Sequence, residues 1–359
     1  MRILVINPGS TSTKVALFED TERIVEQKID HSREELSAFS SIKAELPMRI
    51  SRVKDFLLEN ETSPGELDVI VSRGGMLPPV RHGAYVIDDE LVKTLLERPV
   101  EQHASNLGAG IAQAIAVEGG GVPAFIYDSI SVDELNPLAR FSGIKGYDRR
   151  SFSHVLNTRA VARVIAEREG FDLSKSNVIV AHLGGGISMN LQSNGEIIDV
   201  VSADEGAFST ERAGGIPIYQ AARIAREEGA ETLYAYEIGE GGFTSYLGTN
   251  DAREVERMAA NGDDDARLVI EAMGYQVAKA IAGLATVVNG NVRAIVLTGG
   301  MSHMKRLTDA ISERVSFIAP VFIVPGELEM EALANGAYRV MRGEESAKIL
   351  GDRYVGSLG

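Results

Sequence analysis

The sequence predicts an α/β protein built from two similar halves. Two turns of one plan support this prediction: residues 3–14, ILVINPGSTSTK, and residues 178–189, VIVAHLGGGISM, each run from an apolar strand into a turn of small residues. Each turn is followed by another strand-like segment, at residues 23–29 and 196–201. A plan that recurs along a chain indicates an internal duplication. Strands that alternate with helices in both halves indicate a mixed α/β architecture.

The first half alternates apolar runs with amphipathic segments. After the opening strands we expect helices at residues 34–59, 88–97 and 107–118, and buried strands at residues 67–71 and 123–127. Residues 73–83 are rich in Gly and Pro and are expected to form a loop.

The second half repeats this alternation. Its expected elements around the second glycine turn are helices at residues 154–169, 217–228, 264–288 and 329–342, and strands at residues 293–297 and 321–324. No low-complexity linker separates the halves, so we place a hinge between packed domains near residue 150. The expected domains are residues 1–150 plus 332–359, and residues 151–331.

Composition excludes several classes of protein. A net charge of −15 argues against non-specific binding to nucleic acid or to anionic membranes. The chain has no cysteine, which excludes disulfides, thiolate zinc sites and cysteine nucleophiles. The N-terminus begins with a strand rather than a signal peptide, and no apolar run reaches about 18 residues. We therefore expect a soluble cytoplasmic protein.

The first turn has the composition of a phosphate-binding loop. The turn leaves backbone N–H groups available, and it carries hydroxyls on Ser10, Thr11, Ser12 and Thr13 followed by the ammonium of Lys14. All these groups can face an anion without bulky side chains intervening.

Three motifs in a fixed order extend this prediction. They are NPGSTSTK at residues 7–14, HLGGGIS at 182–188 and LTGGMS at 297–302, with DSIS at 128–131 and TERAGGIP at 210–217 between them. In this combination the chain resembles the acetokinase family of the actin and sugar-kinase superfamily over nearly its whole length. Most of that superfamily has Asp where this chain has Asn7, and the acetokinase branch shares the Asn.

The resemblance implies a fold of two duplicated actin-like, ribonuclease H-like domains with a nucleotide cleft between them. It also implies ATP and Mg²⁺ as cofactors. The nucleotide-binding residues that it implies are Asn7, Gly9, Ser10, Ser12, Lys14, His182, Gly184, Gly185, Gly186, Gly299, Gly300 and Met301.

The resemblance also implies which residues act in catalysis. Arg73 and Arg212 match the family's two arginines around the carboxylate and the transferring phosphoryl group, and a planar guanidinium suits both anions. Arg81 shares the loop with Arg73, so either could contact the substrate. His182 and His154 match histidines near the γ-phosphate.

The remaining implied residues are acids for Mg²⁺. Asp128 matches one family acid, and the second lies near the start of the last helix, where Glu329 and Glu331 both qualify and we favour Glu331. Structural alternatives stay open for several of these residues. His182 could be a satisfied core histidine, and Asp128 could be purely structural. His154 could simply cap the helix that it begins, and Arg212 could form an ion pair with its neighbour Glu211.

The implied reaction moves the γ-phosphoryl group of ATP onto a carboxylate. A carboxylic acid is already ionised at neutral pH, so this transfer needs no general base. Segments SRGGMLPPV at residues 72–80 and GELEMEALANGA at 326–337 resemble the butyrate branch of the family. Two buried methylenes would favour butyrate over acetate by about 15-fold, and an open pocket would admit isobutyrate. The family also implies a homodimer or a larger homo-oligomer.

Competing classes fit less well. A non-enzymatic nucleotide-binding protein of this superfamily would keep the glycine turns but would not need Arg73 and Arg212. A kinase for a sugar hydroxyl would need an acidic base. A dinucleotide oxidoreductase would need more than the Gly-Ala-Gly fragment at residues 108–110.

Overall fold

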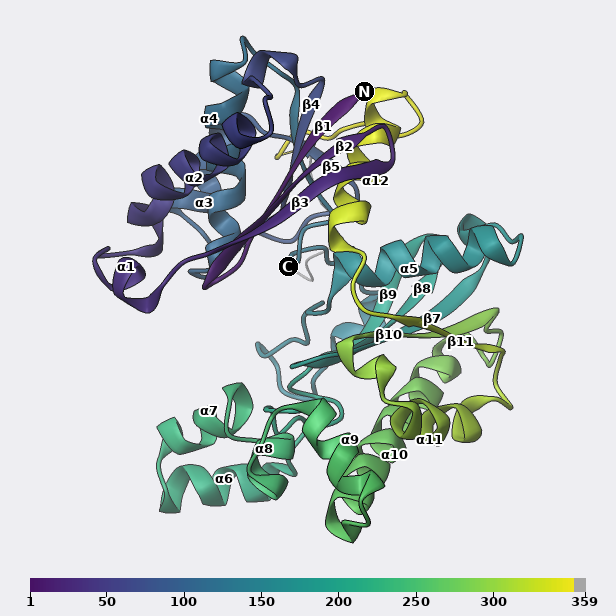
Figure 1. The fold of residues 1–359 in the computed structure, drawn as a ribbon. Coiled ribbons are helices and arrows are strands. Elements are labelled where there is room, and N and C mark those ends of the chain that lie inside the picture. Colours follow the sequence, from purple (N-terminus) through teal and green to yellow (C-terminus); the bar gives the residue numbers. More distant parts are fainter. Residues whose placement is uncertain (352–359) are drawn as a thin grey trace. The chain divides into compact units, whose positions relative to one another are not determined.

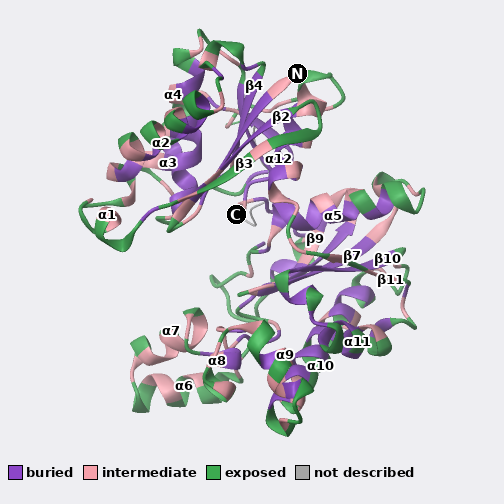
Figure 2. Cartoon of the chain, in the orientation of Figure 1, coloured by how far each residue is buried: buried purple, intermediate pink, exposed green. Residues whose placement is uncertain are grey.

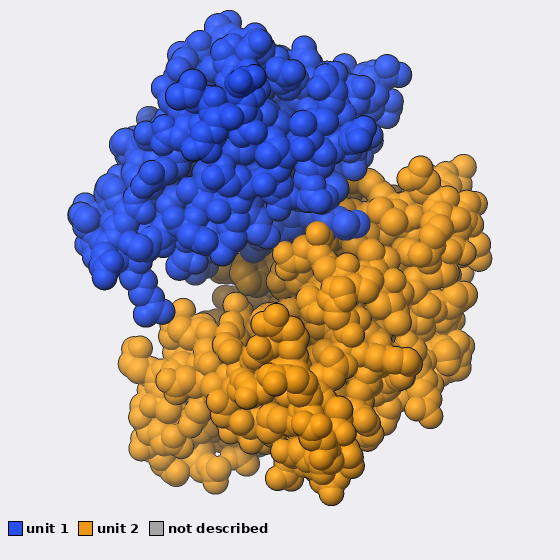
Figure 3. Space-filling model, in the orientation of Figure 1, with its two compact units in different colours: residues 1–133, 328–359 blue, residues 134–327 orange. Residues whose placement is uncertain are grey.

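The computed structural model describes residues 1–351, which form two compact units. Unit 1 combines residues 1–133 with the chain from residue 328 onward, and unit 2 comprises residues 134–327 (Figure 3). Each unit has its own β-sheet and its own helices.

Unit 1 contains a six-stranded sheet in the order β3-β2-β1-β4-β6-β5 (Figure 1). The strands are β1 (Arg2–Pro8), β2 (Ser12–Glu19), β3 (Glu22–Asp30), β4 (Val69–Arg73), β5 (Ala84–Val86) and β6 (Ala124–Tyr127). Strand β1 is antiparallel to β2 and parallel to β4, which is in turn parallel to β6. Strands β1, β4 and β6 are almost wholly buried, as expected for a parallel sheet covered on both faces, whereas β3 is an exposed edge strand (Figure 2).

Helices cover both faces of this sheet. They are α1 (Arg33–Ser37), α2 (Leu46–Glu59), α3 (Asp89–Glu97), α4 (Leu107–Glu118) and α12 (Glu329–Met341). Helix α4 contacts β1, β4 and β6 and also packs on α2 and α3, while α12 contacts β1, β4, β5 and β6 from the opposite face (Figure 1). The single helix expected at residues 34–59 is therefore two helices, because Ser41 caps a 3₁₀ turn at Ile42–Glu45 and Pro47 lies in the first turn of α2.

Unit 2 repeats the plan of unit 1. Its strands are β7 (Asn177–Leu183), β8 (Ile187–Ser193), β9 (Glu196–Val201), β10 (Ala294–Gly299) and β11 (Val321–Pro325). They are ordered β11-β10-β7-β8-β9, so an antiparallel triplet again lies beside a parallel strand, β10 beside β7 here and β4 beside β1 in unit 1. The duplication expected from the two turns is thus visible in the sheet topology.

The helices of unit 2 form a core and a projecting group. They are α5 (Val155–Arg168), α6 (Ile218–Glu227), α7 (Ala230–Ile238), α8 (Gly242–Leu247), α9 (Ala252–Ala260), α10 (Asp264–Val287) and α11 (Lys305–Val315). Helix α5 contacts β7 and β10, while α10 contacts β7, β8, β9 and α11. By length and composition α10 could span a membrane, but its buried side chains belong to the core of this unit. Helices α6 and α7 contact each other and bury no residue (Figure 2).

The chain passes from one unit to the other after residues 133 and 327, earlier in the sequence than the expected boundaries at residues 150 and 331. Residues after Asp133 join unit 2 because they bind its edge strand β9: Asn136 N donates to Ile198 O at 2.9 Å, and Ile197 N donates to Glu134 Oε2 at 3.3 Å. Residues 328–331 join unit 1 because they begin α12, which packs on the sheet of that unit.

Candidate active site

Three parallel strands of unit 1 end side by side and place polar residues at one edge of the sheet. Asn7 lies at the end of β1, Arg73 is the last residue of β4, and Asp128 directly follows β6. The strand register pairs Ile6 with Ser72, and Arg73 with Tyr127. The carboxyl ends of parallel strands are where open α/β sheets bind ligands.

A carboxylate from α12 joins two of these residues. Glu329 Oε2 accepts a hydrogen bond from Asn7 Nδ2 at 2.8 Å and lies 3.5 Å from Arg73 Nη1. Glu329 is in the first turn of α12, where the helix dipole favours an acid. Glu331 instead pairs with Arg23 of the edge strand β3 at 3.3 Å. The structure thus groups Glu329, rather than the Glu331 favoured from sequence, with Asn7 and Arg73.

Asp128 is buried in a left-handed backbone conformation. Its φ is 41°, in the region that non-glycine residues rarely adopt. Two hydrogen bonds to Gly83 hold it there: Gly83 N donates to Asp128 Oδ1 at 2.7 Å, and Asp128 N donates to Gly83 O at 3.1 Å. Backbone strain that the surroundings impose in this way is typical of functional sites. Arg81 lies in the same loop as Gly83, whereas Arg73 lies on β4 beside Glu329.

The first turn joins β1 to β2. Gly9 N donates to Ser12 O at 2.7 Å and closes the turn. Lys14 lies opposite Asn7 in the β1–β2 register, so both side chains project from the same face of the sheet. That face carries α12, because Asn7 binds Glu329 there. Lys14 forms no ion pair within residues 1–351.

The second turn, Gly184 to Gly186 between β7 and β8, lies against the loop that carries Arg212. A Cβ at Gly186 would lie 3.4 Å from Arg212 Nε, which is van der Waals distance, so the glycine turn and the arginine side chain lie side by side. Ser209 Oγ donates to Gly185 O at 2.5 Å and accepts from Arg212 N at 3.1 Å. The hydroxyl thereby ties the arginine loop to the glycine turn.

Arg212 presents a buried donor without an acceptor. Its Nε has no hydrogen-bond partner among residues 1–351, although it is closed off from solvent. The ion pair with Glu211 that the sequence left open does not form, and Glu211 Oε2 accepts from Asn250 at 3.0 Å instead. Buried N–H groups are almost always paired in proteins, so this one indicates an acceptor supplied by a ligand.

Two histidines stack beside the glycine turn of unit 2. The rings of His154 and His182 lie 3.8 Å apart with an interplanar angle of 8°. His154 does not cap helix α5 with its side chain. Its Nδ1 lies 2.8 Å from Ser188 Oγ on β8.

The second histidine has a defined orientation. Asn157 Nδ2 donates to His182 Nδ1 at 3.0 Å and to Thr298 Oγ1 at 3.3 Å, which leaves the proton of a neutral His182 on Nε2. Nε2 faces the start of the glycine turn, where a side chain at Gly184 would lie 2.9 Å away. Glu327 Oε1 lies 3.7 Å from this Nε2.

The backbone of the third motif, residues 297–302, turns sharply at the end of β10. Gly299 has a φ of 89°, and a side chain there would come within 2.4 Å of Leu183 O on β7, so this position requires glycine. Gly299 and Gly326 exchange two backbone hydrogen bonds of 3.0 and 3.1 Å. Gly300 is exposed beside the buried Met301.

Sequence reasoning missed two polar residues around these groups. Asn157 orients His182 and lies three residues after His154, so the spacing on one helix face was the available signal. Glu237, on α7, has its pKa raised to about 7, chiefly by burial and secondly by the charge of Asp204, while Arg212 opposes the rise. No motif marked Glu237.

The acids of unit 1 suit Mg²⁺. Among residues 1–351 no group of three or more His, Asp or Glu side chains is arranged to hold a metal. Mg²⁺, however, usually binds one or two carboxylates together with waters and substrate phosphates. Asp128 and Glu329 supply two such carboxylates at the same edge of one sheet, and both the hydrogen bond of Glu329 with Asn7 and its ion pair with Arg73 use Oε2.

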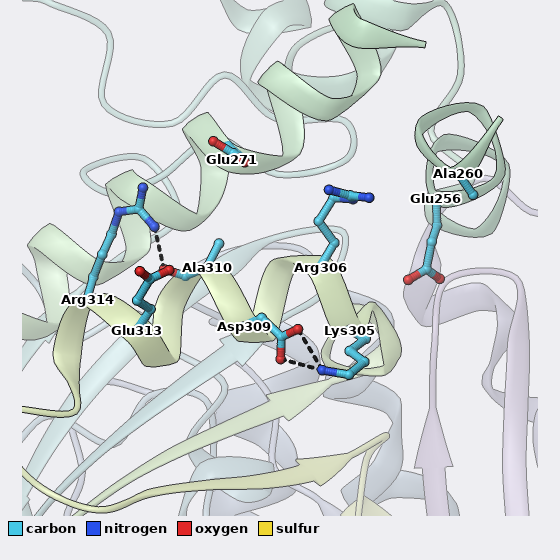
Figure 4. A pocket seen from close by; sticks show the side chains of 9 residues that line it. All are labelled: Glu256, Ala260, Glu271, Lys305, Arg306, Asp309, Ala310, Glu313 and Arg314. Carbon is cyan, nitrogen blue, oxygen red and sulfur yellow. Dashed lines mark hydrogen bonds and ion pairs between the residues drawn. The ribbon is translucent and has the colours of Figure 1, made fainter. Parts of the chain in front are cut away.

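A surface cavity of about 550 Å³ lies elsewhere in unit 2, between α9, α10 and α11 (Figure 4). None of the residues in the three motifs lines it. Among its charged side chains, Lys305 Nζ binds Asp309 Oδ2 at 2.6 Å, and Arg314 Nη1 donates to Ala310 O at 2.8 Å.

Known proteins resemble this chain over nearly its whole length. The sequence profile of the Acetokinase family matches residues 136–315. Butyrate kinase 2 of Clostridium acetobutylicum is 44% identical over 351 residues, which cover 97% of this chain and 98% of that protein. The probable butyrate kinase of Coprothermobacter proteolyticus is 44% identical over 97% of this chain and 99% of its own length.

Solved structures share the fold at lower identity. An acetate kinase of Porphyromonas gingivalis has a TM-score of 0.74 at 18% identity and covers 94% of this chain and 98% of its own. A propionate kinase of Francisella tularensis has a TM-score of 0.73 at 20% identity and covers 93% and 98%. These likenesses, with the repeated sheet topology, show the fold expected from the sequence, two duplicated actin-like α/β domains.

Proposed function

The chain belongs to the acetokinase family, and from this premise we propose that it transfers the γ-phosphoryl group of ATP to butyrate, giving butyryl phosphate and ADP. The chain is a phosphotransferase with a carboxyl group as acceptor. Its similarity to proteins named butyrate kinase, which extends over nearly all of both chains, supports butyrate as the acid.

The reaction is a direct displacement at phosphorus. A carboxylate oxygen of butyrate forms a bond to the γ-phosphorus, and the bond from that phosphorus to the oxygen bridging to the β-phosphate breaks, leaving ADP. Such transfers need alignment and charge stabilisation more than covalent help from the protein. The acid is ionised at neutral pH, so no side chain has to remove a proton.

Arg212 carries this proposal in the structure. Its buried Nε–H has no acceptor among residues 1–351 and lies beside the glycine turn that is proposed to hold phosphate. A guanidinium in this position neutralises the charge that accumulates on the equatorial oxygens of the phosphoryl group. Arg73, which faces Glu329, is proposed to bind the butyrate carboxylate.

His182 is proposed to donate rather than to accept a proton. Asn157 donates to its Nδ1, which places the proton of a neutral ring on Nε2, and this N–H is proposed to donate to a γ-phosphoryl oxygen when ATP is bound. His154 stacks on the ring and binds Ser188, which fixes the plane of both imidazoles. Neither histidine is needed as a base.

The remaining proposed roles concern the nucleotide and its metal. Asp128 and Glu329 would hold Mg²⁺, whose charge neutralises the phosphates when it is bound. Asn7, Lys14, the first turn and the glycine turn at residues 184–186 are proposed to bind phosphates, and Gly299 to Met301 to border the adenosine. We further propose a cytoplasmic homodimer or larger homo-oligomer that uses neither nucleic acid nor membranes as partners.

The first test is formation of acyl phosphate, trapped as hydroxamate, from acetate, propionate, butyrate, isobutyrate and valerate with ATP and Mg²⁺. A maximum at butyrate or isobutyrate supports the proposal. A maximum at acetate keeps the reaction and overturns the substrate. ADP binding without acyl phosphate from any acid would favour a non-enzymatic nucleotide-binding protein.

A further inference from the structure

Arg49, on helix α2, is completely buried in unit 1. A guanidinium inside a protein is costly unless its five N–H donors are paired. Arg49 Nε and Nη2 donate to Glu45 Oε2 at 2.9 and 2.7 Å, which neutralises the charge within one turn of the helix. The remaining donors are directed at the first turn of the chain.

Arg49 binds the carbonyl side of this turn. Nη1 donates to Gly9 O at 2.9 Å and lies 3.3 Å from Ser12 O, and Nη2 donates to Ser10 O at 3.2 Å. His31 N donates to the fourth carbonyl, Thr11 O, at 2.8 Å. Every carbonyl oxygen from residue 9 to residue 12 is therefore engaged by the protein.

The consequence for the N–H groups follows from peptide geometry. The C=O and N–H of a trans peptide point in opposite directions, and the chain contains no cis peptide within residues 1–351. Because Gly9 O and Ser10 O point at Arg49, the N–H groups of Ser10 and Thr11 point away from it. In the part of the chain that the structure describes, neither N–H has an acceptor.

The side chains of strand β2, which follows the turn, agree with these directions. Thr13 Oγ1 lies 3.1 Å from Arg49 Nη1 and 2.9 Å from His31 Nε2, so Thr13 faces the arginine. Neighbouring residues of a strand face opposite sides, which places the Lys14 ammonium on the side away from Arg49. Two N–H groups that have no acceptor among residues 1–351, together with one cation, therefore lie on the side of the turn away from the buried guanidinium.

We propose that Arg49 is a positioning residue for the reaction: by holding the carbonyls of the first turn, it presents the N–H groups of Ser10 and Thr11 to the phosphoryl group. The inference rests on the proposed function, because the proposed function states that the first turn binds phosphate. Arg49 itself touches no substrate. Adjacent N–H groups held in one direction are a general means of binding phosphate.

The test compares Arg49→Lys with two variants of the same segment. Lysine keeps the charge opposite Glu45 but lacks the fork that reaches several carbonyls. We expect kcat/KM for ATP to fall at least tenfold, with KM for butyrate within twofold of the wild type. Arg52→Lys is the matched control and should match the wild type. Arg52 is half-exposed one turn along α2, and its side chain binds Glu35 at 3.1 Å.

Glu45→Gln separates stability from positioning. It weakens the buried ion pair but keeps the Arg49 contacts with the turn, so it should lower the denaturation midpoint while lowering kcat less than Arg49→Lys does. If Arg49→Lys equals Arg52→Lys, or if activity in all variants simply follows the fraction of folded protein, the inference is wrong.

A second readout does not depend on catalysis. The backbone amide resonances of Ser10 and Thr11 should shift when a non-hydrolysable Mg·ATP analogue is added to the wild type, and should shift much less in Arg49→Lys. If these shifts occur in a wild type that forms no acyl phosphate, the proposed function fails and the positioning role stands. Equal shifts in both proteins would overturn the positioning role alone.

Discussion

Arg212 is the residue whose loss should affect turnover most directly. Its proposed contact strengthens as charge accumulates in the transition state, so Arg212→Ala should lower kcat by about 10²–10³-fold. ADP affinity, measured by calorimetry, should stay within about twofold, since the nucleotide keeps its other partners. Arg226→Ala is a suitable control, because Arg226 is exposed on α6 and pairs with its neighbour Glu227 at the surface. Wild-type turnover in Arg212→Ala would remove Arg212 from catalysis.

The two glutamates of the first turn of α12 offer a comparison within one helix. Glu329 binds Asn7 and lies by Arg73, whereas Glu331 pairs with Arg23. Glu329→Gln should raise the Mg²⁺ concentration for half-maximal activity by about tenfold, and Glu331→Gln should leave it unchanged. The measurement is a Mg²⁺ titration of acyl phosphate formation at fixed ATP. The reverse result would restore Glu331 as the metal ligand.

This pair also shows where residue-level prediction from sequence stops. Two residues that are two positions apart in a helix are separated by about 200° around its axis and so lie on nearly opposite sides. Only one of them can therefore face the carboxyl ends of β1 and β4. Choosing between them requires the phase of the helix against β1 and β4, which no motif contains. Arg49 is a similar case, since a polar residue in an amphipathic helix gives no sign that it is fully buried. Arg73, Asp128 and Arg212 could be predicted as site residues because sequence motifs contain them.

At the level of elements, helix α7 brings an acid close to the arginine loop. Ala213 N donates to Tyr236 O at 2.9 Å, and Gly241 N donates to Glu211 O at 3.1 Å, so the C-terminal end of α7 is tied to the loop of Arg212. Glu237 lies in this end of the helix, and its buried Oε1 has no hydrogen-bond partner among residues 1–351. Its pKa is raised from 4.5 to about 7, first by burial and then by Asp204.

The raised pKa of Glu237 predicts a pH-dependent loss of stability. Between pH 4.5 and about 7 the folded state holds a proton on Glu237 that the unfolded state has released, so the free energy of unfolding falls as the pH rises through this window. Glu237→Gln should remove this loss. The variant should therefore gain stability over the wild type at pH 8 by on the order of 1 kcal/mol more than it does at pH 5, a small value because solvent screens the half-exposed site.

Urea denaturation of both proteins at pH 5 and pH 8 measures this effect. Glu240→Gln, which alters an exposed acid just beyond the same helix, should show no such difference between the two pH values. If Glu237→Gln changes stability equally at pH 5 and pH 8, the carboxyl is not protonated in the folded state at the lower pH.

Helices and strands were predictable from sequence where burial requires a recognisable pattern of apolar residues. The buried strands β1, β4, β6, β7 and β10 were found because nearly all their side chains are apolar, and α10 because its apolar face is long. Helices α7, α8, α9 and α11 and the short strand β5 were missed. Helices α9 and α11 bury apolar residues such as Val255 and Leu307, so their amphipathic pattern was available in the sequence. Helix α7 buries no residue, so its sequence needs no amphipathic pattern, and α8 has only six residues.

For the molecule as a whole, the sequence predicted the duplication but not where the units divide. The repeated turns marked each half because both sheets need the same strand-turn-strand beginning. The division at Asp133 depends on hydrogen bonds from residues 134–136 to the edge strand β9, and pairing at an edge leaves no local signature. Composition alone could not place it, since no linker of distinct composition occurs there.

The activity of the whole molecule should depend on acid length in a graded way. Each methylene buried in an apolar pocket contributes about 0.8 kcal/mol, or about a fourfold change in kcat/KM, so propionate should exceed acetate by about fourfold and butyrate should exceed acetate by about 15-fold. The reacting carboxylate is the same in all three acids, and the arginines proposed to bind it do not sense chain length. Because burial of the alkyl chain acts on ground state and transition state alike, the differences should be in KM, with kcat nearly constant. Initial rates with each acid at saturating ATP separate the two parameters. Equal KM values with a kcat that rises with length would mean that the alkyl chain aligns the carboxylate rather than only binding, and valerate slower than butyrate would mark the end of the pocket.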